Sequence, residues 1–199
     1  MKNELLILAL LTSSVVVCSA EEPPFHRFFR QTADLRRTTL DLRVTAVTNV
    51  INPVSMRLTN GWTDVLGFPI RIENRSAKTI TAKIAHEWFG GIWPPTDLSA
   101  AAKRADDPSA LWQASEVYLV GEWGGIAEPS VWQPGQSQVF LLRMNWPGTG
   151  SCHAQPLIDA KAPGKYLVRV SLVFKVTDTL EYFESPEMEV TVAEKPPDK

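Results

Sequence analysis

Cysteine and histidine are scarce in this sequence, with two and three copies respectively. Neither an HExxH motif nor a paired-cysteine spacing occurs, so the usual zinc patterns are absent. No sign of charge dominates, because 20 Lys and Arg stand against 22 Asp and Glu. The missing basic excess argues against a nucleic-acid partner, and no apolar run reaches the roughly 20 residues of a spanning helix. We therefore expect no metal, no cofactor, no nucleic acid and no membrane span.

The first twenty residues have the pattern of a secretory signal peptide. An apolar run at residues 5–11 follows a lysine, and small residues at Cys18–Ala20 flank a cleavage point. A lipoprotein anchor at Cys18 is less favoured, because Val17 stands where a small residue is expected. Cleavage after Ala20 leaves Cys152 without an intrachain partner. We expect an extracytoplasmic protein, either secreted or periplasmic.

Composition divides the chain into four parts. We expect a signal peptide at 1–20, an N-terminal arm or linker at 21–38, a single β-domain at 39–193 and a flexible tail at 194–199. The β-domain carries a long insertion at about 90–130, marked by Gly-Gly and Pro-Pro pairs at its ends.

Alternation of apolar and polar residues with a period of two marks most of the domain. The clearest runs lie at residues 40–47, 70–73, 79–88, 117–120, 140–144, 166–176 and 188–192. Turn signals such as Asn60-Gly61 and Pro163-Gly164 separate them. One short helix is expected at 98–105, where Thr96-Asp97 can cap an alanine-rich segment. About seven short strands without a series of helices predict an all-β fold of two packed antiparallel sheets.

The order of motifs in the last third resembles bacterial secreted immunoglobulin-like or fibronectin-III-like domains. These motifs are Trp132–Ser137, then Phe140 and Leu142, then Ala162–Val170, then Glu187–Val192. They are similar to the last three strands of such domains, with Tyr166 where the penultimate strand begins. The resemblance is at superfamily level and implies an immunoglobulin-like antiparallel β-sandwich of about seven strands. The paired cysteines of the disulfide-bearing branch are absent.

Tryptophan is the most informative residue type, with seven copies in the chain. We single out four of them as candidate binding residues, in or beside the insertion: Trp93, Trp112, Trp123 and Trp132. Large rings with an N–H donor are favoured at protein interfaces and on platforms that stack against sugars. The alternative is a small core in which these rings fix the insertion to one sheet. Trp93 and Trp123 precede Pro-Pro and Gly-Gly pairs, so we expect these two to be the most displayed.

Catalysis by a nucleophile has one dense candidate, the segment Ser151-Cys152-His153. Neighbouring residues on an extended chain point to opposite sides, so Cys152 and His153 do not easily face each other. His86 alternates with apolar neighbours and is expected to be structural. Asn74-Arg75-Ser76 also fits the N-glycosylation acceptor pattern. We identify no catalytic set.

The sequence thus favours a secreted, non-enzymatic immunoglobulin-like module. We expect it to bind another protein through the insertion or through an exposed sheet edge. The alternative is a carbohydrate-binding module that uses exposed tryptophan to hold a polysaccharide. A third hypothesis is an enzyme that depends on Cys152.

Overall fold

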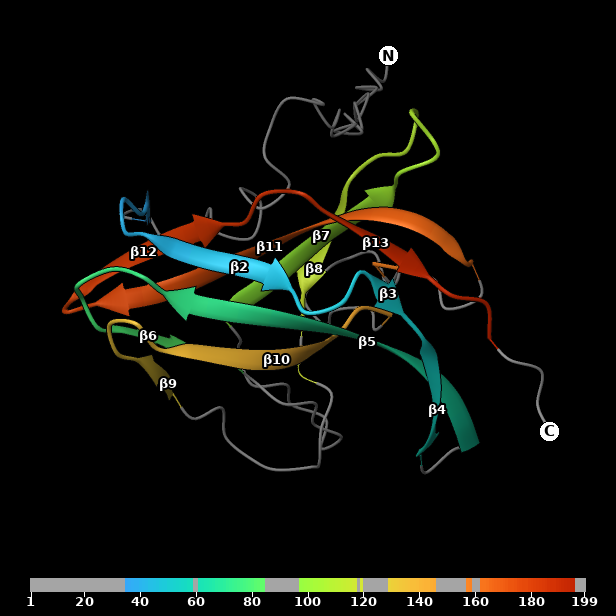
Figure 1. Ribbon diagram of the computed structural model, residues 1–199, viewed down its shortest axis with the longest axis horizontal. Coiled ribbons are helices and arrows are strands. Elements are labelled where there is room, and N and C mark those ends of the chain that lie inside the picture. The colour runs from blue at the N-terminus through green and yellow to red at the C-terminus, as the bar shows by residue number, and fades with distance from the viewer. Residues whose placement is uncertain are drawn as a thin grey trace, which may run out of the picture.

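The structure is a computed structural model that describes residues 35–58, 61–84, 97–117, 119, 129–145, 157–158 and 162–195. Within these ranges the chain forms strands and no helix, so the expected all-β class is confirmed (Figure 1). The expected signal peptide and most of the expected arm lie outside the described residues. The described part of the chain contains no helix long and apolar enough to cross a membrane.

Thirteen strands are described, more than the seven expected. They are β1 (Arg36–Arg37), β2 (Leu42–Ala46), β3 (Val50–Ile51), β4 (Pro53–Leu58), β5 (Gly61–Asn74), β6 (Ile80–Lys83), β7 (Leu98–Arg104), β8 (Gln113–Glu116), β9 (Pro129–Trp132), β10 (Ser137–Arg143), β11 (Gly164–Val176), β12 (Thr179–Glu184) and β13 (Met188–Val192). Nine belong to one sheet, while β2, β4, β5 and β10 form the other.

The larger sheet is built on both edges of β11. One edge pairs first with β7 and then with β6, and the other edge pairs with β13 and then with β12. Outside these lie β8 against β7, β9 against β6, β3 against β13 and β1 against β12. The alternation expected at 166–176 is confirmed, since Tyr166, Val168, Val170, Leu172, Phe174 and Val176 are all buried.

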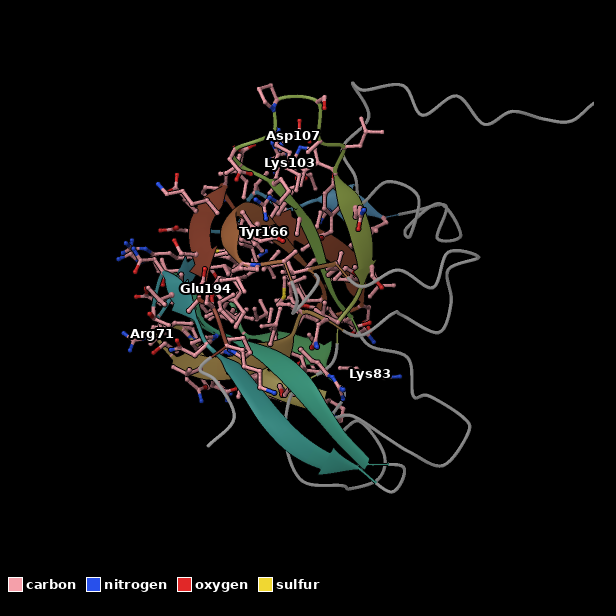
Figure 2. All side chains as sticks on the ribbon, turned by 90° about the vertical axis from the view of Figure 1, so that its right-hand side faces the viewer. Arg71, Lys83, Lys103, Asp107, Tyr166 and Glu194 are labelled. Atoms are coloured by element: carbon pink, nitrogen blue, oxygen red, sulfur yellow. The ribbon has the colours of Figure 1, made fainter. Side chains whose placement is uncertain are left out.

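The smaller sheet is built on β5. Its second half pairs with β2 on one edge and with β10 on the other, whereas its first half pairs with β4 alone. The turn expected at Asn60-Gly61 falls between β4 and β5, which begins at Gly61. The resulting hairpin projects away from the two packed sheets (Figures 1 and 2).

The two sheets pack around one hydrophobic cluster. Alternate residues of β2, β5 and β10 face alternate residues of β6, β7, β11 and β13, and the cluster includes Val44, Phe68, Ile70, Ile72, Leu142, Ile80, Leu98, Val170 and Val190. Because strand side chains alternate between faces, one register places every second residue of each strand in this layer.

The helix expected at 98–105 is wrong. Residues 98–104 form β7, which lies between β11 and β8 and buries its first five residues on both faces. Strands buried on both faces read as continuous runs of small or apolar residues and lose the period of two. Three consecutive alanines favour a helix in isolation, but the weak intrinsic preference is overridden by pairing on both edges.

The larger sheet is mixed, whereas a purely antiparallel one was expected. Two strands of two residues each run parallel to their neighbours, β1 beside β12 and β3 beside β13. Both cover sheet edges that would otherwise offer unpaired backbone groups. A two-residue strand carries no periodic signal, so the sequence pattern could not reveal either pair.

A one-residue bulge separates β12 from β13. Glu184 pairs with Ser171 and Met188 with Val168, so four steps along one strand match three steps along β11. Pro186 lies inside this bulge, where a residue without an N–H costs no ladder hydrogen bond. As a result, residues three apart in sequence lie on the same side of the sheet.

The start of β11 is fixed by the Tyr166 side chain. Its hydroxyl donates to the carbonyl of Ala162, 2.7 Å away and four residues earlier. The Arg104 guanidinium lies 5.1 Å from the ring centroid and donates to the carbonyl of Pro163. Gly164 follows with a φ of 138°, a conformation that suits glycine. The expected Pro163-Gly164 turn therefore has a specific side-chain support.

Glu181 ties β1 to the sheet, and we expect this contact to make stability depend on pH. The carboxylate accepts from the Thr38 hydroxyl at 2.6 Å and from Arg36 at 2.7 Å, and Glu181 is only 6% exposed. The hydrogen bond from Thr38, and then that from Arg36, lowers the pKa of Glu181 below its ordinary 4.5. A carboxyl group whose pKa is lower in the folded than in the unfolded protein stabilises the fold at pH values above its unfolded pKa. This contribution disappears as the pH falls through the folded pKa.

We therefore expect Glu181→Gln to lower the free energy of unfolding at pH 7 by about 1 kcal/mol. The difference between variant and parent should shrink steadily as the pH falls below 4.5. Urea titrations at a series of pH values measure this. A difference that stays constant down to acidic pH would contradict the role of the ionised carboxylate.

Candidate functional site

The connection from β7 to β8 presents an ordered tip at the surface. The Asp107 carboxylate accepts from the Ser109 backbone N–H at 2.9 Å and from its hydroxyl at 2.6 Å. These hydrogen bonds lower the pKa of Asp107, and the Ala110 N–H donates to its carbonyl. Leu111 follows and is 69% exposed, the most exposed of the large hydrophobic side chains described. Figure 2 shows Asp107 and Lys103 at the end of the molecule opposite the β4–β5 hairpin.

Trp112 lies beside this tip, half-buried on the outer face of the larger sheet. Its ring takes two cations: the Arg169 guanidinium carbon lies 4.7 Å from the ring centroid, and the Lys103 ammonium lies 5.1 Å from it. Lys103 lies on β7, Arg169 on β11, and Trp112 directly before β8. The pairing of β7 with β8 and with β11 brings the three side chains together. Cation–π contacts of this kind hold a ring in one orientation.

Two carboxylates hold Arg169 in place. Its guanidinium donates to Glu184 at 3.2 Å and to Glu187 at 2.5 Å. The bulge makes this possible, since residues 184 and 187 would face opposite sides of a regular strand. Burial alone would lower the pKa of Arg169, but the two acidic partners raise it. The guanidinium is therefore charged and held in one position by its two ion pairs.

We call Lys103, Leu111, Trp112 and Arg169 the Trp112 face. Lys103 has no carboxylate partner among the described residues, whereas Arg169 has two. The face offers one apolar side chain, one amphipathic ring and one uncompensated positive charge.

The structure separates the tryptophans that the sequence grouped together. Trp112 is at the surface, but Trp132 on β9 is fully buried and its ring centroid is 5.7 Å from that of Phe140. Trp132 therefore presents no surface to a partner, and its ring belongs to the main hydrophobic cluster between the two sheets. Trp93 and Trp123 lie outside the described residues. The sequence analysis did not single out Leu111, Lys103 and Arg169 as binding residues. Leu111 is the sequence neighbour of Trp112, whereas Lys103 and Arg169 come close to it only through strand pairing.

The glycosylation pattern at Asn74 is incompatible with the fold. Asn74 is fully buried, and its amide nitrogen donates to the carbonyls of Lys78 and Trp132 at 2.7 and 3.1 Å. A glycan on that nitrogen would break both hydrogen bonds and has no space. The Asn74 side chain is therefore a structural link between β5, the turn after it and β9.

The described residues hold no group of three or more His, Cys, Asp or Glu that could bind a metal ion. The segment Ser151-Cys152-His153 and His86 lie outside the described residues, so the hypothesis of a Cys152-dependent enzyme stays a prediction.

Comparisons with known proteins do not place the chain in a family. No family model matches the sequence, and no curated protein matches it. Among solved structures, a Bordetella pertussis chain named ApaA is 9% identical, with a TM-score of 0.38; the match covers 82% of this chain and 99% of that one. At that TM-score the likeness supports no statement about fold or activity.

Proposed function

We propose that this protein is a non-enzymatic, extracytoplasmic immunoglobulin-like module that binds another protein through the Trp112 face. The observation that carries the proposal is the fixed Trp112 ring, held by Arg169 and Lys103 beside the exposed Leu111. Trp and Arg are the residues most enriched among those that dominate binding energy at protein interfaces. A ring and a guanidinium held in place before binding lose less conformational entropy on association.

The immunoglobulin-like part of the proposal is supported by Tyr166. A tyrosine near the start of the penultimate strand, hydrogen-bonded to the backbone a few residues upstream, is a recurrent feature of that architecture. The bond from Tyr166 to Ala162 has this hydrogen-bond geometry, on a strand that β12 and β13 both follow. The extracytoplasmic location rests on the signal-peptide pattern of residues 1–20.

Carbohydrate binding is the weaker alternative. A sugar-stacking platform needs an open ring face, but the two cations already lie over Trp112. Trp132 has no exposed surface at all. Of the candidate tryptophans whose side chains the structure describes, Trp132 is buried and the Trp112 ring already carries two cations.

The test is a pull-down from the envelope and secreted fractions of the native cell, with residues 21–199 as bait. We expect Trp112→Ala to reduce the amount of captured partner about tenfold or more, because truncation of such residues typically costs over 1.4 kcal/mol. Leu180→Ala is the matched control, since Leu180 is also exposed at 41% but lies on β12. Equal capture by parent and Trp112→Ala would remove the Trp112 face as the binding site.

A further inference from the structure

A groove of about 590 Å³ runs between β2 and the connection that joins β12 to β13. Its floor is apolar, because Ala46, Phe183 and Met188 are partly buried and pack against the core. Arg37 and Arg43 also line it, together with Glu184 and Glu187. The groove therefore combines an apolar floor with a charged rim, and two of its rim residues, Glu184 and Glu187, are those that hold Arg169.

The β2 side of this groove is an open strand edge. Val47 donates to Pro69, and Arg75 donates to Asp41, so the odd-numbered residues of β2 direct their backbone groups toward β5. Val44 and Ala46 then direct their N–H and C=O groups away from β5 and into the groove. In the described part of the chain β2 pairs with β5 alone. A row of backbone donors and acceptors is thus available to an extended chain.

Charge selects the kind of chain that would fit. Arg37 and Arg43 are exposed and form no ion pair with any described residue, whereas Glu184 and Glu187 are both engaged by Arg169. The uncompensated charge on the rim is therefore positive. Arg43 lies on the solvent side of the smaller sheet, and the apolar floor lies on the other side of β2.

We propose that the edge of β2 binds an extended segment of a partner protein, in which acidic and apolar residues alternate, by adding it as a strand to the smaller sheet. The acidic side chains lie beside Arg43, the apolar ones lie over Phe183 and Met188, and the partner backbone pairs with Val44 and Ala46. This inference rests on the proposed protein-binding function and gives it a second contact, separate from the Trp112 face.

The test uses the purified protein and a fluorescent peptide of alternating Glu and Val, measured by anisotropy. Two isomers of this peptide carry backbone N-methyl groups, one at every Glu and the other at every Val. Successive amides of a strand point to opposite edges, so only one isomer loses the donors that face β2. We expect that isomer to bind about tenfold or more weakly, and the other to bind within about twofold of the unmodified peptide.

Variants of the protein test the same site from the other side. Arg43→Glu should weaken peptide binding about tenfold, while Arg71→Glu, on the same sheet face but outside the groove lining, should change it less than about twofold. Ala46→Pro removes only an N–H that points away from β5 and should also weaken binding. Circular dichroism verifies that each variant is folded.

Equal binding of both methylated isomers, or equal effects of Arg43→Glu and Arg71→Glu, would show nonspecific attraction to a polyanion and overturn the strand-addition site. Trp112→Ala should leave peptide binding unchanged. If the peptide fails to bind while capture of a partner still depends on Trp112, the edge site falls and the proposed function stands. If the peptide does not bind and capture of a partner does not depend on Trp112, both proposals fall.

Discussion

Trp132→Ala should lower the free energy of unfolding by about 3–5 kcal/mol, a much larger loss than that of Trp112→Ala. Trp132 is fully buried and contacts Phe140 across the core. Its removal loses both the transfer free energy of a large ring and the contacts of the atoms around the resulting cavity. A loss of this size is a large fraction of a typical domain's total stability.

Urea unfolding followed by circular dichroism measures this loss. Trp112→Ala is the matched control, and we expect it to cost no more than about 1 kcal/mol because the ring is half-buried and held by cation–π contacts. Trp132→Phe should cost less than Trp132→Ala, since it keeps a ring and removes an Nε1 donor that has no hydrogen-bond partner in the described structure. Similar losses for Trp132→Ala and Trp112→Ala would contradict the assignment of Trp132 to the core.

Asn74→Ala should lower the free energy of unfolding by about 2–4 kcal/mol, because one small side chain makes several buried or partly buried hydrogen bonds worth about 1 kcal/mol each. Its amide donates to the carbonyls of Lys78 and Trp132, and its oxygen accepts from the N–H and hydroxyl of Ser76. The truncation leaves the buried carbonyl of Trp132 without this donor, while the Lys78 carbonyl still accepts from the Ser76 hydroxyl.

Thermal and urea unfolding of Asn74→Ala, beside Ser76→Ala, test this expectation. Ser76→Ala removes one hydroxyl at a solvent-accessible turn and should cost less than about 1 kcal/mol. Asn74→Asp is a second comparison: it keeps the shape and the acceptor but cannot donate, so it should lose most of the same free energy. A fully stable Asn74→Asp variant would show that the two donated hydrogen bonds contribute little.

Alternating hydrophobic residues made several strands predictable. The runs that became β2, β10, β11 and β13 were all identified, and most of the expected apolar residues are buried, with Ala46 and Met188 partly buried. These strands have one face in the core and the other toward solvent, so the pattern in the sequence reflects their environment directly. β12 was not predicted, because a charged residue, Glu181, occupies a buried position where Arg36 and Thr38 donate hydrogen bonds to it.

The Trp112 face was only partly predictable. Trp112 was identified from its residue type, but Arg169 stands 57 residues away and was expected only to face solvent opposite the apolar side of its strand. Their contact depends on the pairing of β7 with β11, which an expected helix at 98–105 had obscured. Trp132 was misassigned because residue type alone does not distinguish a ring at an interface from a ring in a core.

The sequence by itself determined the all-β class, the positions of the regularly alternating strands and the main turns, because period-two burial and Pro or Gly turn chemistry are local properties. Only the tertiary structure decided that an alanine-rich segment becomes β7, that Trp132 is buried, and that a bulge brings Glu184 and Glu187 together on Arg169. Each of these depends on pairing between segments distant in the chain, and intrinsic preferences of about 1 kcal/mol or less per residue are too small to oppose it.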